Sequence, residues 1–102
     1  MEVSAAASDD VERIFLYIAE AGTDATTRSF VAALLDHCRR VAALPGTLGT
    51  ARPDLAPDLR STPHKRYIVY FRYSGDTVQI VNILDASRDA VAHFADSSTP
   101  TQ

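Results

Sequence analysis

Two apolar strands joined by a tight turn constrain the fold of this chain more than any other feature. Residues 66–73 and 77–84 are rich in aromatic and β-branched side chains, which are the residue types favoured in strands. Gly75 lies between them and can adopt the positive φ of a hairpin turn. Both segments carry apolar side chains on both faces, as strands at the centre of a covered sheet do. With a short strand expected at 59–62, the second half of the chain predicts an antiparallel sheet.

The first half of the chain predicts two amphipathic helices, because apolar residues recur there at the spacing of one helix face. These residues are Ala7, Val11, Ile14, Phe15 and Ile18 in the first helix, and Phe30, Leu34, Cys38, Val41 and Leu44 in the second. Ser4 or Ser8 can cap the first helix, and Gly22 ends it. Pro45-Gly46 stops the second helix. Because few residues separate the two helices, we expect them to pack as an antiparallel hairpin.

Helices followed by strands are typical of an α+β fold. We expect the N-terminal helical hairpin to pack on one face of a small antiparallel β-sheet, with a short C-terminal helix at 89–94. Residues 2–4 could add one further strand. Residues 45–58 contain three prolines and two glycines, which predicts an irregular loop. The chain is therefore interpreted as a single domain over 1–95 with a flexible C-terminal tail over 96–102.

Composition argues against several classes of function. The chain of 102 residues has no apolar stretch as long as a membrane span, and its N-terminus has no signal-peptide pattern. We therefore expect a cytoplasmic protein with no membrane partner. The single cysteine, Cys38, and three scattered histidines do not make a zinc pattern. The sequence accordingly predicts no metal site and no cofactor.

Charge is distributed unevenly along the chain. The net charge of −3 argues against a general nucleic-acid binder, whose phosphate contacts need a basic surface. Acidic residues dominate 1–24, and Asp9, Asp10 and Glu12 fall near the start of the first helix, where carboxylates suit the positive end of the helix dipole. Cationic residues gather instead within 52–72. That segment predicts a local basic face on an acidic protein.

A set of residues occurs in a characteristic order along these elements. Its members are Ala7, Asp10, Val11, Ile14, Tyr17 and Ile18, then Leu44, Pro45, Gly49, Arg52 and Pro53, then Leu59, Arg60 and Ser61, then Arg66, Tyr67, Tyr70, Phe71 and Arg72, and finally Ile80, Leu84, Arg88 and Asp89. The set resembles the ParE branch of the ParE/RelE toxin superfamily, the toxin half of bacterial toxin–antitoxin pairs. Three departures stand out: the first strand is shorter than the family's, Asn82 stands where the family often has Arg, and Asp85 stands where it usually has His.

The resemblance implies the toxin of a type II toxin–antitoxin system. Such a toxin inhibits DNA gyrase without catalysis and is neutralised by a ParD-like antitoxin, through which alone it would bind operator DNA. No catalytic residue is assigned on this interpretation. The candidates for contact with partner or target are Arg52, Arg60, Arg66, Arg72, Arg88 and Asp89. Arg88 and Asp89 also fit a plainer role, in which Asp89 lies at the start of the last helix and Arg88 pairs back to the sheet.

Two alternatives remain open at this point. A RelE-like ribosome-dependent mRNA endoribonuclease needs cations clustered with a titrating group, for which His64 is the candidate in the strand region. The sequence pI of about 5.4 fits docking into ribosomal RNA poorly. A non-toxic relative that only binds an antitoxin is the second alternative. It rests on the short first strand, on Asn82, and on Asp85, which places an anion where the family has a possible cation.

The aromatic residues of the first long strand offer a recognition stripe or a core. Because alternate residues of a strand face opposite sides, Tyr67, Phe71 and Tyr73 share one face and Tyr70 takes the other. We expect most of them to lie in the core, as aromatic residues of central strands do.

Overall fold

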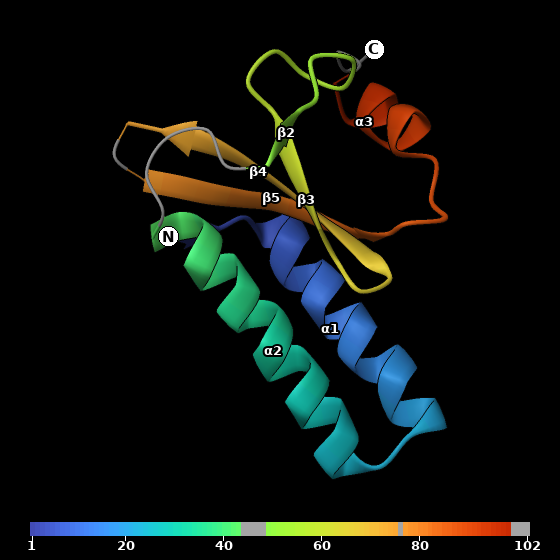
Figure 1. The fold of residues 1–102 in the computed structure, drawn as a ribbon. Helices are drawn as coiled ribbons and strands as arrows, with labels where there is room; N and C mark the ends of the chain where they lie inside the picture. The colour runs from blue at the N-terminus through green and yellow to red at the C-terminus, as the bar shows by residue number, and fades with distance from the viewer. Residues whose placement is uncertain (44–48, 76, 99–102) are drawn as a thin grey trace.

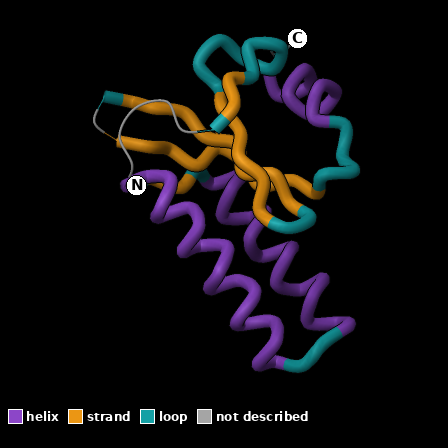
Figure 2. Tube along the Cα trace, in the orientation of Figure 1, coloured by secondary structure: helices purple, strands orange, loops and turns teal. Residues whose placement is uncertain are grey.

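The computed structural model describes residues 1–43, 49–75 and 77–98 of the chain. Its elements in chain order are β1 (Glu2–Val3), α1 (Ala5–Ala21), α2 (Asp24–Ala43), β2 (Thr50–Ala51), β3 (Arg60–His64), β4 (Tyr67–Ser74), β5 (Thr77–Asp85) and α3 (Ala90–Ser98). The helices α1 and α2 form a hairpin on one face of the sheet, and α3 lies on the other face (Figures 1 and 2). This arrangement confirms the predicted α+β fold. The predicted stop of the second helix at Pro45-Gly46 lies outside the described residues, as does Leu44.

The sheet has five strands in the order β1-β5-β4-β3-β2. The hairpin strands β4 and β5 are central, as predicted, and the pairings from β2 to β5 are antiparallel. Residues 2–3 do form a strand, and β1 runs parallel to β5 with Glu2 opposite Gln79 and Val3 opposite Ile80. The sheet is therefore mixed at this one edge.

A β-bulge interrupts the ladder between β4 and β5. Tyr70 pairs with Asn82, whereas its neighbour Phe71 pairs with Ile80, so Val81 is an extra residue in β5. A bulge shifts the alternation of side chains between the two faces of a strand. Ile80 and Ile83 consequently pack on the helical side of the sheet, although three positions separate them.

The core consists of one apolar layer on each face of the sheet. The larger layer lies under α1 and α2 and contains Ala7, Ile14, Leu34, Cys38, Val41, Tyr67, Val69, Phe71, Val78, Ile80 and Ile83. The smaller layer contains Leu55, Leu59, Tyr70, Leu84 and Phe94. The aromatic residues of β4 divide between the faces as predicted, and the Tyr70 ring meets the Phe94 ring of α3 at 5.0 Å between centroids. Full burial of each such side chain contributes about 1.5–3 kcal/mol.

Element boundaries differ from the predictions by more than one residue in three places. The segment predicted as a loop over 45–58 contains β2, because Thr50–Ala51 pairs with β3. β3 continues beyond its predicted end to His64. It includes Pro63 because β2 pairs only with Arg60 and Ser61, so β3 is an edge strand there and the missing N–H of proline costs no ladder bond. Finally, α3 continues to Ser98 and so includes the start of the predicted tail.

The buried face of α1 also differs from the predicted stripe. Ala7 and Ile14 are buried as expected, but Phe15 is 38% exposed, because it lies about 100° around the helix from Ile14. Asp10 was expected near the start of the helix; α1 begins at Ala5, so Asp10 lies beyond its first turn, and it is only 2% exposed. The reason for its burial lies in the contact between α1 and β5. None of the helices in the described residues is both long and apolar enough to cross a membrane.

Candidate partner-binding groove

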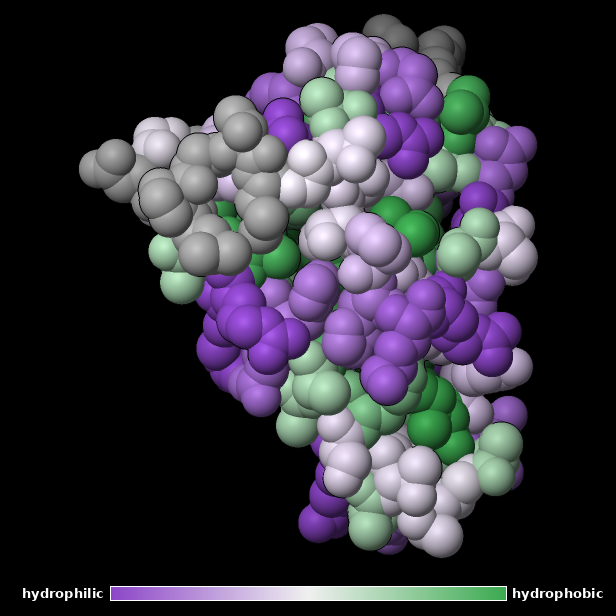
Figure 3. Space-filling view, in the orientation of Figure 1, coloured by the Kyte–Doolittle hydropathy of each residue, from purple (hydrophilic) through white to green (hydrophobic). Residues whose placement is uncertain are grey.

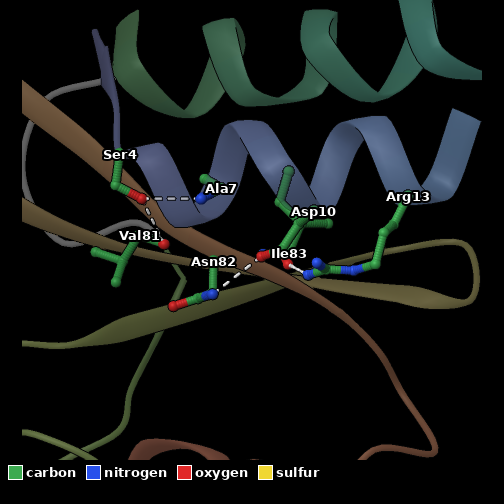
Figure 4. A network of polar contacts seen from close by, with 7 residues as sticks. All are labelled: Ser4, Ala7, Asp10, Arg13, Val81, Asn82 and Ile83. Atoms are coloured by element: carbon green, nitrogen blue, oxygen red, sulfur yellow. Dashed lines mark hydrogen bonds and ion pairs between the residues drawn. The ribbon is translucent and has the colours of Figure 1, made fainter. Parts of the chain in front are cut away.

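Ser4 attaches the start of α1 to the bulged strand (Figure 4). Its backbone N–H donates to the Ile80 carbonyl at 2.9 Å, and its hydroxyl donates to the Val81 carbonyl at 2.7 Å. The same hydroxyl accepts the Ala7 N–H at 3.0 Å, which makes Ser4 the N-cap of α1. One side chain therefore caps the helix and satisfies a carbonyl that the bulge turns away from β4.

Asp10 holds the next turn of α1 against β5. One carboxylate oxygen accepts from the Asn82 amide and from the Ile83 backbone N–H, both at 2.9 Å, and the other oxygen pairs with Arg13 (Figure 4). A buried carboxylate is tolerated only when it is paired and hydrogen-bonded, and three donors meet that need. The sequence did carry a signal for this contact, because position 10 lies three residues after Ala7 and four before Ile14, within the buried stripe.

A groove of about 370 Å³ opens next to this contact, between α1 and the end of β5. Its walls come from α1, from the turn between β3 and β4, and from the end of β5 and the turn after it. The lining residues are Asp10, Arg13, Ile14, Tyr17, Arg66, Tyr67, Ile83, Leu84, Asp85 and Arg88. The groove thus combines an apolar floor with three guanidinium groups.

Arg66 closes one side of the groove by contacts with three elements. Its guanidinium carbon lies 5.7 Å from the centroid of the Tyr17 ring and 6.0 Å from that of Tyr67, within the range of cation–π attraction. Its Nε donates to Asp85 at 3.1 Å. Hydrogen bonds from the Ser87 backbone N–H and hydroxyl lower the pKa of Asp85, and Arg66 lowers it further. Asp85 therefore remains an anion that orients Arg66 over the groove.

The turn that presents Arg66 is strained. Lys65 has a φ of 54°, and it is the only non-glycine residue with a positive φ in the part of the chain that the structure describes. Such a conformation favours glycine. The strained turn places Arg66 at the groove next to Tyr67.

The predicted contact residues fall into separate groups. Arg66 and Arg88 line the groove, whereas Arg52 pairs with Asp54 at 3.1 Å and Arg60 donates to the Gly49 carbonyl at 2.8 Å. Arg72 lies further along β4, opposite Gln79.

Asp89 has a structural contact at the start of α3. Its carboxylate accepts the Ala92 N–H at 3.1 Å. This is the N-terminal role that the plainer interpretation gave it. The same interpretation paired Arg88 with the sheet, but no ion pair of Arg88 is present among the described residues. The Arg88 side chain is exposed and lines the groove.

Among the groove residues absent from the predicted contact set are two exposed side chains of α1, Arg13 and Tyr17. Tyr17 is 57% exposed, and the Arg13 side chain is 64% exposed. The spacing of four residues, which places both side chains on one face of α1, was the available signal in the sequence.

In the space-filling view, hydrophilic surface crosses the middle of the molecule and hydrophobic surface lies below it over the helical hairpin (Figure 3).

His64 lies in a different environment from the groove. Its ring packs at 4.9 Å from that of His37 and at 6.3 Å from that of Phe30, both on α2. Burial lowers the pKa of His64, and His37, Lys65 and Arg40 lower it further. Within the described residues, no three His, Cys, Asp or Glu side chains gather as a metal site requires.

Comparison with known proteins places this geometry in a family. The family model described as the ParE toxin of the type II toxin–antitoxin system parDE matches residues 1–90. A solved structure described as the chromosomal ParDE toxin–antitoxin system from P. aeruginosa has a similar fold, with a TM-score of 0.71 and 17% sequence identity over 82% of this chain and 91% of that one. No curated protein sequence matches the chain. Because the family model spans both helices of the hairpin and the whole sheet, this chain belongs to the ParE toxin family of type II toxin–antitoxin systems.

Proposed function

We propose that this protein inhibits DNA gyrase by binding it, without catalysis, and that a ParD-like antitoxin neutralises it in the cytoplasm. The match to the ParE family model over residues 1–90 carries this proposal. The groove supports it, because an apolar floor ringed by guanidinium groups suits a protein contact. Operator DNA is bound only indirectly, through the antitoxin.

The target is tested by DNA supercoiling with purified gyrase. The protein should abolish supercoiling when it is in molar excess, and addition of the antitoxin should restore it. Gyrase that remains fully active at high toxin excess would contradict the proposed target. Expression of the chain alone, and then with the product of the neighbouring reading frame, tests whether the chain is toxic and whether that product is its antitoxin.

A non-toxic relative that only binds an antitoxin is a second candidate, and two contacts favour it. Asn82 and Asp85 stand where the family often has Arg and usually has His. Asn82 bonds Asp10, and Asp85 bonds Arg66 and Ser87. Both positions are thus occupied by internal contacts instead of free cations. Expression of the Asp85→His variant distinguishes the candidates: a variant toxic where the unaltered chain is harmless supports the non-toxic relative.

The ribonuclease alternative has less support, because His64 packs against α2 whereas Arg66 and Arg88 lie at the groove. Cleaved message in a translating extract that is lost in the His64→Ala variant would restore it.

A further inference from the structure

No strand among the described residues covers the edge of β5 where it borders the groove. β1 pairs with β5 only at Gln79 and Ile80. Ser4 then covers the Val81 carbonyl, and Asp10 takes the Ile83 N–H. Past Ile83, the Asp85 carbonyl accepts the Arg88 N–H at 2.9 Å, and the Ile83 carbonyl and the Asp85 N–H have no strand beside them among the described residues. A free strand edge offers main-chain groups to an added strand.

The charged side chains that line the groove beside this edge carry one more positive than negative charge. Arg13 is paired with Asp10, and Arg66 with Asp85. Arg88 is exposed and has no ion-pair partner among the described residues. The groove is thus locally positive on a protein of net charge −3. A carboxylate that arrives here meets a planar fork of donors, which binds carboxylates in two-point fashion.

The floor of the groove and the strand edge beside it favour an extended chain. The groove is an open hollow of about 370 Å³, and a segment that also bonds to the edge of β5 must be extended to do so. Ile14, Leu84 and the exposed ring of Tyr17 provide apolar contacts for alternate side chains.

We propose that this groove binds an extended acidic segment of a partner polypeptide, with one carboxylate on Arg88 and an apolar side chain against Tyr17. The inference rests on the proposed antitoxin partnership, and the occupant is the antitoxin's acidic segment. A nucleic-acid strand fits less well, because it carries a phosphate at every nucleotide, whereas Arg88 is the one groove cation without an ion-pair partner among the described residues.

The test uses a fluorescent peptide of eight residues that alternates Leu with Asp, with an otherwise identical Leu–Asn peptide as its control. Fluorescence anisotropy with the purified protein should show binding of the acidic peptide, and binding of the Leu–Asn peptide at least tenfold weaker. The Arg88→Gln and Tyr17→Ala variants should each weaken the acidic peptide about tenfold.

The matched control is Arg39→Gln. Arg39 is an exposed residue of α2 paired with Asp36, and its substitution changes the net charge as Arg88→Gln does. It should leave the affinity within twofold. Equal loss in both arginine variants, equal binding of both peptides, or displacement of the peptide by an eight-nucleotide RNA would overturn the proposal. Thermal unfolding checks that the variants are folded.

Pull-down with the product of the neighbouring reading frame separates failure of this inference from failure of the proposed function. If that protein binds the unaltered chain and the Arg88→Gln variant equally, the groove assignment is wrong although the antitoxin partnership stands. If it does not bind the unaltered chain, the partnership itself fails, and the groove assignment to an antitoxin fails with it.

Discussion

The two helices of the hairpin meet the sheet in different ways. α1 is attached by directional hydrogen bonds of 2.7 to 2.9 Å, which join Ser4 and Asp10 to β5. α2 rests on β3 and β4 by ring packing, with one long contact of 3.5 Å between His37 Nε2 and the Thr62 hydroxyl. His64 Nε2 is buried there with no hydrogen-bond partner among the described residues.

The difference shows why the groove lies along α1. Directional bonds fix both the position and the rotation of a helix, so the outward residues of α1 meet β5 in one arrangement. Apolar and ring contacts tolerate small shifts more easily, because they have no strict geometry. The attachment of α1 should therefore be costly to break. The attachment of α2 should depend on the uncharged state of the His37 and His64 imidazoles, which pack against each other.

The largest effect should come from the Asp10→Ala substitution. It leaves the buried Asn82 amide and the Ile83 N–H without their acceptor, and we expect a loss of about 3 kcal/mol in the free energy of unfolding. Urea denaturation measures it. Asp9→Ala, an exposed change on the same helix, should cost less than about 0.5 kcal/mol. Similar losses for the two variants would mean that the Asp10 contact does not hold α1.

Ser4→Ala and Thr23→Ala compare the N-caps of the two helices directly. Ser4 caps α1 and also bonds β5, whereas Thr23 accepts the Thr26 N–H at an exposed site. We expect a loss of about 2 kcal/mol for Ser4→Ala, the sum of a cap and a buried carbonyl bond. Thr23→Ala should cost about 1 kcal/mol or less. A larger loss at Thr23, measured by thermal unfolding, would reverse the ranking of the helices.

Much of this arrangement follows from local patterns in the sequence. Helical periodicity predicted α1 and α2, and the strand composition around Gly75 predicted β4 and β5, because each signal depends on neighbours in the chain. The bulge at Val81 and the partners of Asp10 on β5 could not be predicted in the same way. Each depends on where α1 crosses β5, which is a tertiary relation.

The groove was predicted only in part for the same reason. The sequence predicted Arg66 and Arg88 as candidates for contact with a partner. Arg13 and Tyr17 did not, because a helix sequence does not say which edge of a sheet its outer face meets. The cationic residues of 52–72 predicted one local basic face. The structure instead distributes its arginines over separate contacts, such as Arg52 with Asp54 and Arg60 with the Gly49 carbonyl.

Acid should weaken the attachment of α2 before that of α1. Burial lowers the pKa values of both His37 and His64 below the ordinary 6.5, with further lowering by Arg40 on His37. The unfolded chain then binds protons first, so the stability present above pH 6.5 declines as the pH falls through the lowered values. Urea denaturation from pH 7.5 to 5 should show this decline, and the His37→Gln/His64→Gln double variant should reduce it.

His93→Gln is the control for that pH dependence. Its ring contacts Phe94 within α3 and lies apart from α2, so the decline should persist in this variant. Persistence of the full decline in the double variant as well would mean that the histidine pair does not report on the α2 contact.

The smallest expected change in stability concerns Lys65. It lies in the turn between β3 and β4, next to His64, which contacts α2, and Arg66, which contacts α1. Its positive φ of 54° is strained for a side chain, so Lys65→Gly should gain about 0.5 kcal/mol of stability, the relief of strain reduced by the greater freedom of glycine in the unfolded chain. The change also removes a cation that lowers the pKa of His64, so the decline in acid should become slightly shallower. Lys65→Asn separates the relief of strain from the entropy of the unfolded chain, because asparagine tolerates this φ without the backbone freedom of glycine. If both variants lower the stability at pH 7.5, relief of backbone strain is not the dominant effect at this position.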